Sequence, residues 1–428
     1  MKRNDSEELE MNGTEGELAV YVHLPFCVRK CLYCDFISGV YEKSIQKSYV
    51  NKLLWEIEEF FEREYPVKKP VIKSVFFGGG TPSVLPAEEI GRILCKLKEY
   101  GEFTDTEITV EVNPGTVDAV DSYEKTEVVV TESLAGETAK EKNKRDNKLE
   151  EYKRMGINRL SIGMQSTCDG ELKSLGRIHN YEEFLKTFRL AREAGFENIN
   201  VDVMYAIPGQ DFASFENTLR KTAESGPEHI SAYSLIVEEG TPFAEMKLNL
   251  PSEEEERRMY ASVERILGEY GYHQYEISNY AKEGRECRHN KAYWTGKEYA
   301  GFGVAAASFL YKKREGNSYP DFRYTNTESV EAYLNAETYE DLKNIRREEE
   351  ILSKEEQMAE FVILGLRMNR GVKREDFYKV FGKEPEEVFA EPIRKHVKDG
   401  LLLINENGDL VLSKRGFDLA NIVMADFL

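Results

Sequence analysis

Three of the six cysteines crowd into one short run, Cys27-Val-Arg-Lys-Cys31-Leu-Tyr-Cys34. Thiolates are the usual protein ligands of iron–sulfur clusters, and a cubane cluster normally takes four of them. Three cysteines in one loop can therefore ligate three irons of a [4Fe–4S] cluster and leave the fourth iron open to a small molecule. The spacing predicts such a cluster on Cys27, Cys31 and Cys34.

An open iron can be chelated by the amino and carboxylate groups of a methionine, which places a sulfonium next to a reductant. One-electron transfer then cleaves a C–S bond and gives a carbon radical, and this chemistry belongs to the cofactor rather than to the protein. The alternative is a structural zinc site that uses the same cysteines with His23. Zinc favours four closed ligands, and His23 precedes Cys27 within an expected strand, so its reach counts against zinc.

The other cysteines, Cys95, Cys168 and Cys287, are scattered along the chain. So few thiols suit a reducing compartment better than a disulfide scaffold, and Cys95 and Cys168 are expected to be packing residues. Residues 1–17 are polar and mostly acidic, so they lack the apolar core of a secretory signal. The sequence predicts a cytoplasmic protein with a flexible N-terminus over these residues and no transmembrane segment.

The charge balance is acidic, with 78 Asp and Glu against 58 Lys and Arg and a formal net charge of −20. Nucleic-acid-binding proteins usually carry a basic patch, and no long Lys/Arg block occurs here. Nucleic acid is therefore excluded as the main partner. An anionic small molecule remains compatible with the sequence, because local basic residues can hold it against an unfavourable overall field.

Short β-rich runs alternate with amphipathic helical segments. The expected strands span residues 18–25, 74–79, 107–113, 159–166, 198–208 and 229–237. The expected helices span residues 48–65, 87–100, 181–194, 212–225 and 253–270. This alternation predicts an α/β fold with a parallel sheet and right-handed crossovers. The number of units predicts a partial (β/α)6 barrel resembling a TIM barrel rather than a closed one.

Chemically distinctive residues fall near the ends of the expected strands. They are Cys27, the turn Gly78–Thr81, Glu111, Gln165, Arg177 and Asp202. Active sites in such folds lie at the C-terminal ends of the strands. Glycines let backbone groups approach a ligand closely, carboxylates and amides suit hydroxyl and amino groups, and an arginine suits a carboxylate. Their shared position favours one ligand-binding rim.

The barrel and its extension are expected over residues 18–310. Residues 117–149 are rich in charged and polar residues and are expected to form a disordered insertion. Residues 311–352 are expected to connect the barrel to an accessory domain at 353–428. That domain is expected to be helical and winged-helix-like, because a capping-box pattern occurs at Ser353 and Glu356 and a hairpin pattern at residues 401–412. A lid or packing role is expected for it.

The motifs YxHxPFCxxxCxxC, GGGTPS, EVNPG and IGMQS resemble the radical-SAM superfamily and, within it, the oxygen-independent coproporphyrinogen III oxidase group. That group contains true oxidases and HemW-type heme chaperones. The resemblance implies that the open iron binds S-adenosylmethionine (SAM). It also implies SAM contacts at Tyr21, Tyr33, Gly79, Gly80, Thr81, Glu111, Gln165, Arg177 and Asp202, with Ser234 as a further contact.

Two features separate the branches of this group. True oxidases carry another cysteine two residues after the third ligand, where this chain has Phe36. Conversely, the run Cys287-Arg288-His289-Asn290-Lys-Ala-Tyr293-Trp294 resembles the HNxxYW signature of HemW-type proteins. Imidazole is a good axial ligand for heme iron, which makes His289 the leading candidate and Cys287 the alternative. The other interpretation is that His289 is a hydrogen-bonding residue of a polar surface loop and that Cys287 is simply buried. Tyr293 and Trp294 could stack on a porphyrin, Asn290 belongs to the same set, and Arg285 or Arg288 could meet its propionates.

Two functions stay open at this point. The first is a heme chaperone that binds a [4Fe–4S] cluster, SAM and heme as cargo, and delivers the heme to an acceptor protein. The second is an enzyme that uses SAM to decarboxylate coproporphyrinogen III oxidatively to protoporphyrinogen IX. An electron donor such as flavodoxin or ferredoxin is compatible with both. His23 and His179 could act as hydrogen-bond donors near the cluster.

Overall fold

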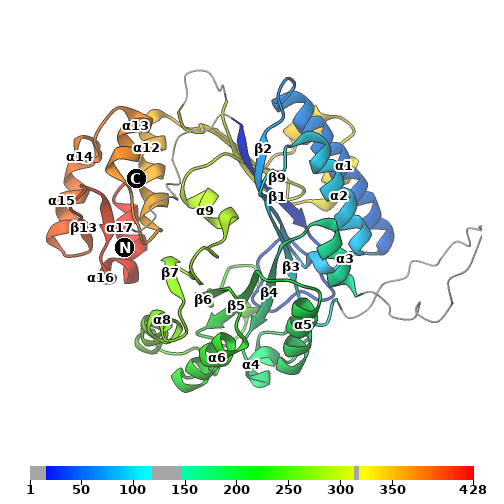
Figure 1. Ribbon diagram of the computed structural model, residues 1–428, viewed down its shortest axis with the longest axis horizontal. Helices are drawn as coiled ribbons and strands as arrows, with labels where there is room; N and C mark the ends of the chain where they lie inside the picture. The colour runs from blue at the N-terminus through cyan, green and yellow to red at the C-terminus, as the bar shows by residue number, and fades with distance from the viewer. Residues whose placement is uncertain (1–15, 118–146, 313–317) are drawn as a thin grey trace, which may run out of the picture.

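The computed structural model describes residues 16–117, 147–312 and 318–428, and it is built around one curved sheet (Figure 1). The strand order is β12-β11-β10-β9-β1-β2-β3-β4-β5-β6-β8-β7. The parallel strands are β1 (Glu17–Leu24), β2 (Val71–Gly79), β3 (Glu107–Val112), β4 (Arg159–Gln165), β5 (Ile199–Tyr205), β6 (His229–Ser234) and β9 (Tyr299–Phe302). The first six lie in chain order. This arrangement confirms the predicted partial barrel.

Helices cover the outer face of the parallel strands (Figure 1). They are α1 (Lys43–Glu64), α2 (Ala87–Tyr100), α3 (Lys148–Met155), α4 (Asp169–Ser174), α5 (Tyr181–Glu193), α6 (Phe212–Ser225) and α8 (Glu253–Gly268). The short α7 (Pro242–Glu245) lies against the cysteine loop, where the Phe243 amide donates to the Leu32 carbonyl. In α1, the fully buried Leu53 and Ile57 share the face that packs on the sheet. Such apolar stripes at helical spacing supply the burial that holds each helix on the barrel.

Short antiparallel strands extend both edges of the sheet. They are β8 (Asn279–Ala281) and β7 (His273–Glu276) beyond β6, and β10 (Ala307–Leu310), β11 (Phe322–Thr325) and β12 (Glu348–Ile351) beyond β9. The interval 311–352, which was expected to connect the barrel to the accessory domain, also forms part of the sheet. It contributes two strands to the main sheet and also carries α10 (Val330–Asn335) and α11 (Tyr339–Asn344). Its strands are too short for alternation to reveal them in the sequence.

The insertion expected at residues 117–149 falls mainly on residues outside the described ranges, but its two ends are ordered. Val117 is fully buried, and Asn147 caps α3 by accepting a hydrogen bond from the Glu150 amide. The ammonium of Lys148 is buried and donates to the carbonyls of Ser83 (2.8 Å) and Thr116 (3.3 Å). The expected boundaries are therefore too wide, because Lys148 is one of the anchors of α3.

The C-terminal domain packs around a second core, which includes Val362, Leu366, Phe377 and Leu402 and also takes in Phe309 of β10. Its elements are α12 (Lys354–Leu366), α13 (Arg374–Phe381), α14 (Pro385–Val388), α15 (Ala390–Lys398), β13 (Leu402–Ile404), β14 (Leu410–Leu412), α16 (Lys414–Asp418) and α17 (Ala420–Ala425). The predicted capping box begins α12, and β13 pairs with β14 as an antiparallel hairpin.

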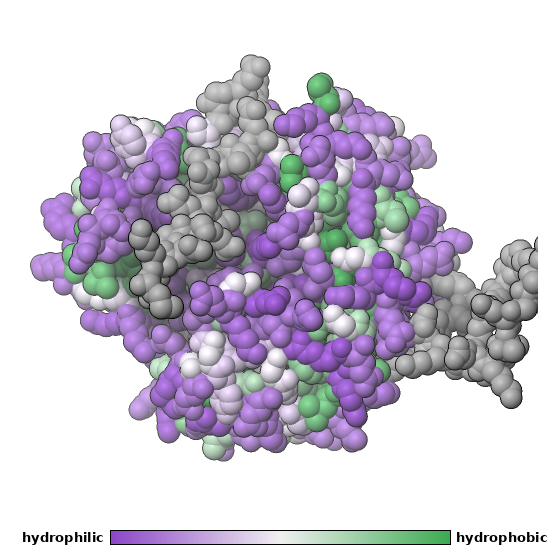
Figure 2. All heavy atoms as spheres, in the orientation of Figure 1, coloured by the Kyte–Doolittle hydropathy of each residue, from purple (hydrophilic) through white to green (hydrophobic). Residues whose placement is uncertain are grey.

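The remaining helix, α9 (Arg288–Trp294), lies in the concavity of the sheet and contacts both β2 and α12 (Figure 1). It therefore stands between the barrel and the C-terminal domain. Figure 2 shows that the face turned to the viewer is mainly hydrophilic, as the 32% of charged residues would suggest. Within the described ranges, no helix combines the length and the apolar character needed to cross a bilayer.

Candidate functional site

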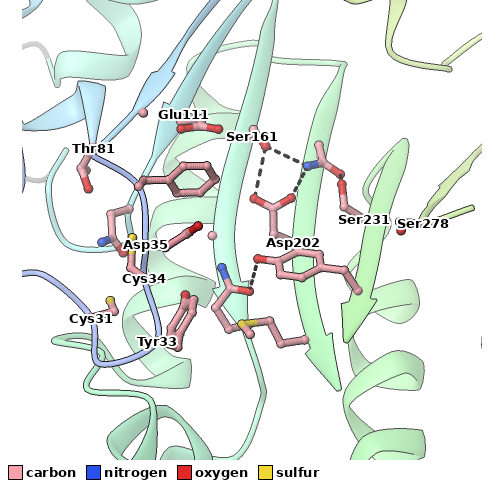
Figure 3. A pocket seen from close by; sticks show the side chains of 18 of the residues that line it. Cys31, Tyr33, Cys34, Asp35, Thr81, Glu111, Ser161, Asp202, Ser231 and Ser278 are labelled. Carbon is pink, nitrogen blue, oxygen red and sulfur yellow. Dashed lines mark hydrogen bonds between the residues drawn. The ribbon is translucent and has the colours of Figure 1, made fainter. Parts of the chain in front are cut away.

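A cavity of about 590 Å³ opens at the C-terminal edge of the parallel strands. Its wall comes from the loop after β1, residues along and just after β2 to β6, the β7–β8 turn, α9 and the end of α12. In Figure 3, Cys31, Tyr33 and Cys34 lie on one side of this cavity, and Ser161, Asp202 and Ser231 lie on the other. The position agrees with the strand-end rim expected for this fold.

The three clustered cysteines all line the cavity and are partly exposed. The Cys27 thiol lies 3.7 Å from the Thr81 hydroxyl, and Nη1 of Arg177 lies 3.6 Å from the Cys31 sulfur. Burial raises the pKa of the Cys27 and Cys34 thiols in the metal-free chain. A metal would lower the cost of deprotonation, since thiolates are the coordinating form. These thiols could therefore hold a cluster at the wall of the cavity.

The zinc alternative fails on His23. This side chain is 3% exposed, its Nδ1 pairs with the Tyr21 hydroxyl at 3.1 Å, and its Nε2 pairs with the Ile37 carbonyl at 2.8 Å. Over the described ranges, no three His, Cys, Asp or Glu side chains are grouped to hold one metal ion. A cubane cluster does not need three side chains around one metal ion, because each cysteine binds a different iron.

The glycine-rich turn is packed against the strand that leads into the cysteine loop. Gly79 has φ +105°, and a Cβ there would lie 2.6 Å from the His23 ring. A Cβ on Gly80 would lie 2.8 Å from the backbone of Phe26. Glycine is therefore required at both positions, and the turn brings its backbone to the cavity wall beside Thr81.

Two carboxyl groups face the cavity from neighbouring parts of the sheet (Figure 3). Burial, followed by the charge of Asp202, raises the pKa of Glu111 to about 8, although the Gly79 amide donates to it. Asp202 accepts hydrogen bonds from Asn200 (2.7 Å) and Ser161 (3.3 Å), and burial raises its pKa as well. A pair of buried carboxyls held near each other suits a ligand that supplies hydroxyl or ammonium donors.

Amide and guanidinium groups complete this part of the wall. Gln165 takes the positive φ of 71° where β4 ends in a bulge, and its Oε1 accepts from the Tyr233 hydroxyl at 2.9 Å. Arg177 Nη2 donates to Asn113 Oδ1 (2.7 Å) and the Gly163 carbonyl (2.6 Å). Its buried Nε has no hydrogen-bond partner in the described part of the chain. An unpaired guanidinium N–H beside the cysteine loop suits a ligand carboxylate.

Most of the expected SAM residues therefore come together. Tyr33, Gly79, Gly80, Thr81, Glu111, Gln165, Arg177, Asp202 and the less secure Ser234 all line the cavity. Tyr21 does not, because its hydroxyl is turned to His23. Sequence reasoning missed Asn113, Ser161, Asn200, Ser231 and Tyr233, which also line the wall. Asn113 and Asn200 stand two residues from Glu111 and Asp202, so strand alternation was the signal that could have found these two.

The expectations about two further cysteines are wrong. Cys95 and Cys168 were expected to pack, but both are exposed. His179, which was expected to be a hydrogen-bond donor near the cluster, is buried, and its Nε2 pairs with the Met164 carbonyl at 3.2 Å. Its pKa falls to about 3 because of burial and the charge of Arg177.

His289 has the surroundings of a hydrogen-bonding residue in this structure, and its role as a heme ligand stays a prediction. It is 2% exposed, its Nδ1 pairs with the Ser74 hydroxyl and its Nε2 with the Tyr293 hydroxyl, both at 2.9 Å. Burial and the charge of Arg159 lower its pKa to about 3. Both ring nitrogens are thus engaged inside the protein.

The alternative ligand Cys287 and the remaining HNxxYW residues fall into two groups, those that are engaged inside the protein and those that line the cavity. Cys287 is fully buried and its thiol donates to Glu107 at 3.4 Å, while burial raises its pKa to about 12. Arg288 is engaged with Asp105 rather than with a ligand. Only Asn290 and Trp294 of this set line the cavity. The motif therefore builds the floor of the cavity and its buried support.

We expect the substitution His289→Ala to lower the free energy of unfolding by about 2–4 kcal/mol, because it leaves a void and two unpaired hydroxyls. Urea denaturation of the full-length chain measures this loss. His273→Ala is the matched control, since that side chain is 45% exposed. Wild-type stability combined with a loss of heme binding would contradict the structural role and return His289 to the iron.

Comparison with known proteins adds sequence evidence to this geometry. The Radical SAM superfamily matches residues 21–222, and the HemN C-terminal domain matches residues 352–419. The chain is 31% identical over 416 residues to the heme chaperone HemW of Bacillus subtilis (strain 168), an alignment that covers 96% of this chain and 99% of that protein. It is 33% identical to the heme chaperone HemW of Lactococcus lactis subsp. lactis (strain IL1403), covering 96% and 97%.

Among solved structures, coproporphyrinogen III oxidase (HemN) from Escherichia coli, described as a radical SAM enzyme, superposes with a TM-score of 0.75. The sequence identity is 23%, and the match covers 96% of this chain and 90% of that one. This likeness shows a shared fold, namely an open parallel barrel with a C-terminal helical domain.

Proposed function

The chain belongs to the HemW family of radical-SAM proteins, and from that premise we propose that it is a heme chaperone. It holds a [4Fe–4S] cluster and SAM, binds heme as cargo and delivers it to an acceptor protein. Membership in a radical-SAM family implies the cluster and SAM. The observation that carries the proposal is the similarity to HemW relatives over nearly the whole chain, both domains included.

The cluster is assigned to Cys27, Cys31 and Cys34. The loop that carries them is held in place before any metal binds, since the Cys27 amide donates to the Gly39 carbonyl at 2.8 Å and the Leu32 amide to the Leu175 carbonyl at 3.1 Å. Arg177 places positive charge beside Cys31, which favours the thiolate. When bound, the cluster supplies an electron and an open iron.

SAM is assigned to the wall between the cysteine loop and β5. Gly79, Gly80 and Thr81 line the cavity beside the cysteines, and Arg177 offers its unpaired Nε to a carboxylate. Glu111 and Asp202 accept hydrogen bonds from hydroxyl or ammonium groups. The donor and acceptor set of the wall thus fits the polar groups of SAM, and the wall contributes binding and orientation.

Heme is assigned to the part of the cavity that SAM leaves, next to Asn290 and Trp294. The Trp294 indole is a suitable surface for a porphyrin. His289 and Tyr293 support this wall from behind through their own hydrogen bond. An electron donor such as flavodoxin or ferredoxin would reduce the cluster from outside. Phe36, which is 62% exposed at the cavity, stands where the oxidases of the group have a further cysteine.

An anaerobic comparison of the two activities tests this function. We expect reconstituted protein to take up heme with a stoichiometry near one per chain and to form no protoporphyrinogen IX from coproporphyrinogen III at catalytic rates. Absorbance titration measures the first quantity, and product analysis in the presence of SAM and a reductant measures the second. Turnover of coproporphyrinogen III at rates typical of enzymes, about 1 s⁻¹ or faster, would replace the chaperone with the oxidase.

A further inference from the structure

The C-terminal domain reaches the cavity through one side chain. Within its described residues, 352–428, only Arg367 at the end of α12 lines the wall. The following residues attach the domain to β7: Met368 bridges to Glu276, and the Asn369 amide donates to the Tyr275 carbonyl at 3.0 Å. The Asn369 side chain also donates to the Gln274 carbonyl at 2.5 Å. This attachment fixes where Arg367 enters the cavity.

Glu276 lies next to Arg367 but accepts no direct hydrogen bond from its guanidinium group. The carboxyl is fully buried, and its Oε1 accepts from the Ser278 amide (2.9 Å) and from Asn279 Nδ2 (2.5 Å). Its Oε2 has no hydrogen-bond partner in the described part of the chain and lies 3.8 Å from Arg367 Nη2, which is too long for a direct hydrogen bond. Burial raises the pKa of Glu276. Glu276 and Arg367 therefore interact electrostatically without forming a hydrogen-bonded ion pair.

Buried N–H donors are left over at the same wall. The guanidinium of Arg367 lies over the Trp294 ring, 4.2 Å from its centroid. Neither Arg367 Nε nor Trp294 Nε1 has a hydrogen-bond partner over the described residues, and the same holds for Nε of Arg159, which is 1% exposed and also lines the cavity. Each unpaired buried donor costs about 1–3 kcal/mol, so the wall is built for a group that brings acceptors.

The chemistry of that group follows from the donors and the charges. Two guanidiniums, Arg159 and Arg367, line the cavity, where Glu276 is the carboxyl beside Arg367 and Asp202 is the one that interacts with Arg159. A carboxylate accepts several N–H bonds at once and matches the planar fork of a guanidinium. An ammonium or a metal ion would meet mainly donors at the N–H groups of Arg367 and Trp294. Neither Arg367 nor Glu276 belongs to the cysteine loop or to the SAM wall.

We propose that Arg367 and Trp294 form a subsite for a carboxylate of the second ligand of this cavity, supplied by the C-terminal domain and limited by the neighbouring Glu276. The proposal rests on the proposed function, because on that function the carboxylate is a side arm of the heme. The C-terminal domain then takes part directly in cargo binding, and a cargo without its carboxylates binds less tightly.

The test compares two probes on the full-length, anaerobically reconstituted protein with SAM present: heme, and the heme dimethyl ester, whose carboxylates are blocked. We expect the wild type to prefer heme by about tenfold or more, as one charge-assisted contact implies. Arg367→Gln should remove most of this preference. Arg394→Gln, on the exposed face of α15, is the matched control and should keep it. Glu276→Gln should keep or increase it, because it removes the competing carboxyl.

The outcomes distinguish a failure of the subsite from a failure of the proposed function. Equal affinity of the wild type for heme and its ester would overturn the subsite and leave the chaperone function standing. An unchanged preference in Arg367→Gln would do the same. If Arg367→Gln does not fold, a loss of the preference in Glu276→Gln would count against the subsite by itself. A wild-type protein that binds neither probe would overturn the proposed function and the subsite together.

Discussion

Replacing Cys31 with alanine is expected to abolish the brown [4Fe–4S] absorbance that the wild type gains on anaerobic reconstitution. Two cysteines would remain, and no other cysteine of the described residues lines the cavity. A cubane cluster held by only two protein thiolates loses a large part of its binding energy, because that energy depends on the identity and number of the protein ligands. Iron and sulfide analysis, together with spin-resonance spectra of the reduced protein, measures the loss.

The matched control is Cys95→Ala. Cys95 is exposed on α2 and outside the cavity, so this variant should reconstitute like the wild type. SAM binding gives a second readout, because the open iron is one of its anchors, and Cys31→Ala should weaken it while circular dichroism stays unchanged. Full iron content in Cys31→Ala, or zinc without iron in freshly purified anaerobic wild type, would contradict the cluster assignment.

Regular periodicity made most of the barrel predictable. The helices α2 and α6 span the residues that their apolar spacing predicts, because each packs one continuous apolar stripe on the sheet. The cysteine loop and the glycine turn were predictable for a different reason. Their residue types are required by local chemistry: the thiols by coordination, and Gly79 by its φ of +105° and its approach to His23.

The floor of the cavity was not predictable in this way. Residues 285–290 read as a polar surface loop, but His289 and Cys287 are buried there by partners far away in the chain, Ser74 and Glu107. Such a buried polar network depends on tertiary packing, which a single sequence does not display. Arg367 is a second case, because a basic residue at the end of a helix ordinarily complements the helix dipole at the surface.

Glu111→Gln is expected to make the ligand-free chain more stable at alkaline pH. Burial and Asp202 raise the pKa of Glu111 to about 8 from the ordinary 4.5. Below pH 4.5 the group is protonated in both the folded and the unfolded chain, so it costs nothing. As pH rises from 4.5 to about 8, the unfolded chain ionises while the folded chain resists, so the wild type loses stability. Above about 8 the penalty is complete.

The difference in unfolding free energy between Glu111→Gln and the wild type should therefore be small near pH 5 and reach a few kcal/mol above pH 8, since one pKa unit corresponds to about 1.4 kcal/mol. Urea denaturation of the cluster-free, full-length chain at several pH values measures it. Glu253→Gln, whose side chain is 79% exposed, should follow the wild type. The same Glu111→Gln change should weaken SAM binding by about tenfold or more, because it removes a carboxyl that a bound ammonium or hydroxyl donor would hold as an acceptor. A stability difference that does not vary with pH would contradict the buried, shifted carboxyl, whereas unchanged SAM affinity would remove Glu111 from the SAM wall. The gain in stability and the loss of binding have one cause: the barrel keeps a costly carboxyl where the ligand needs it.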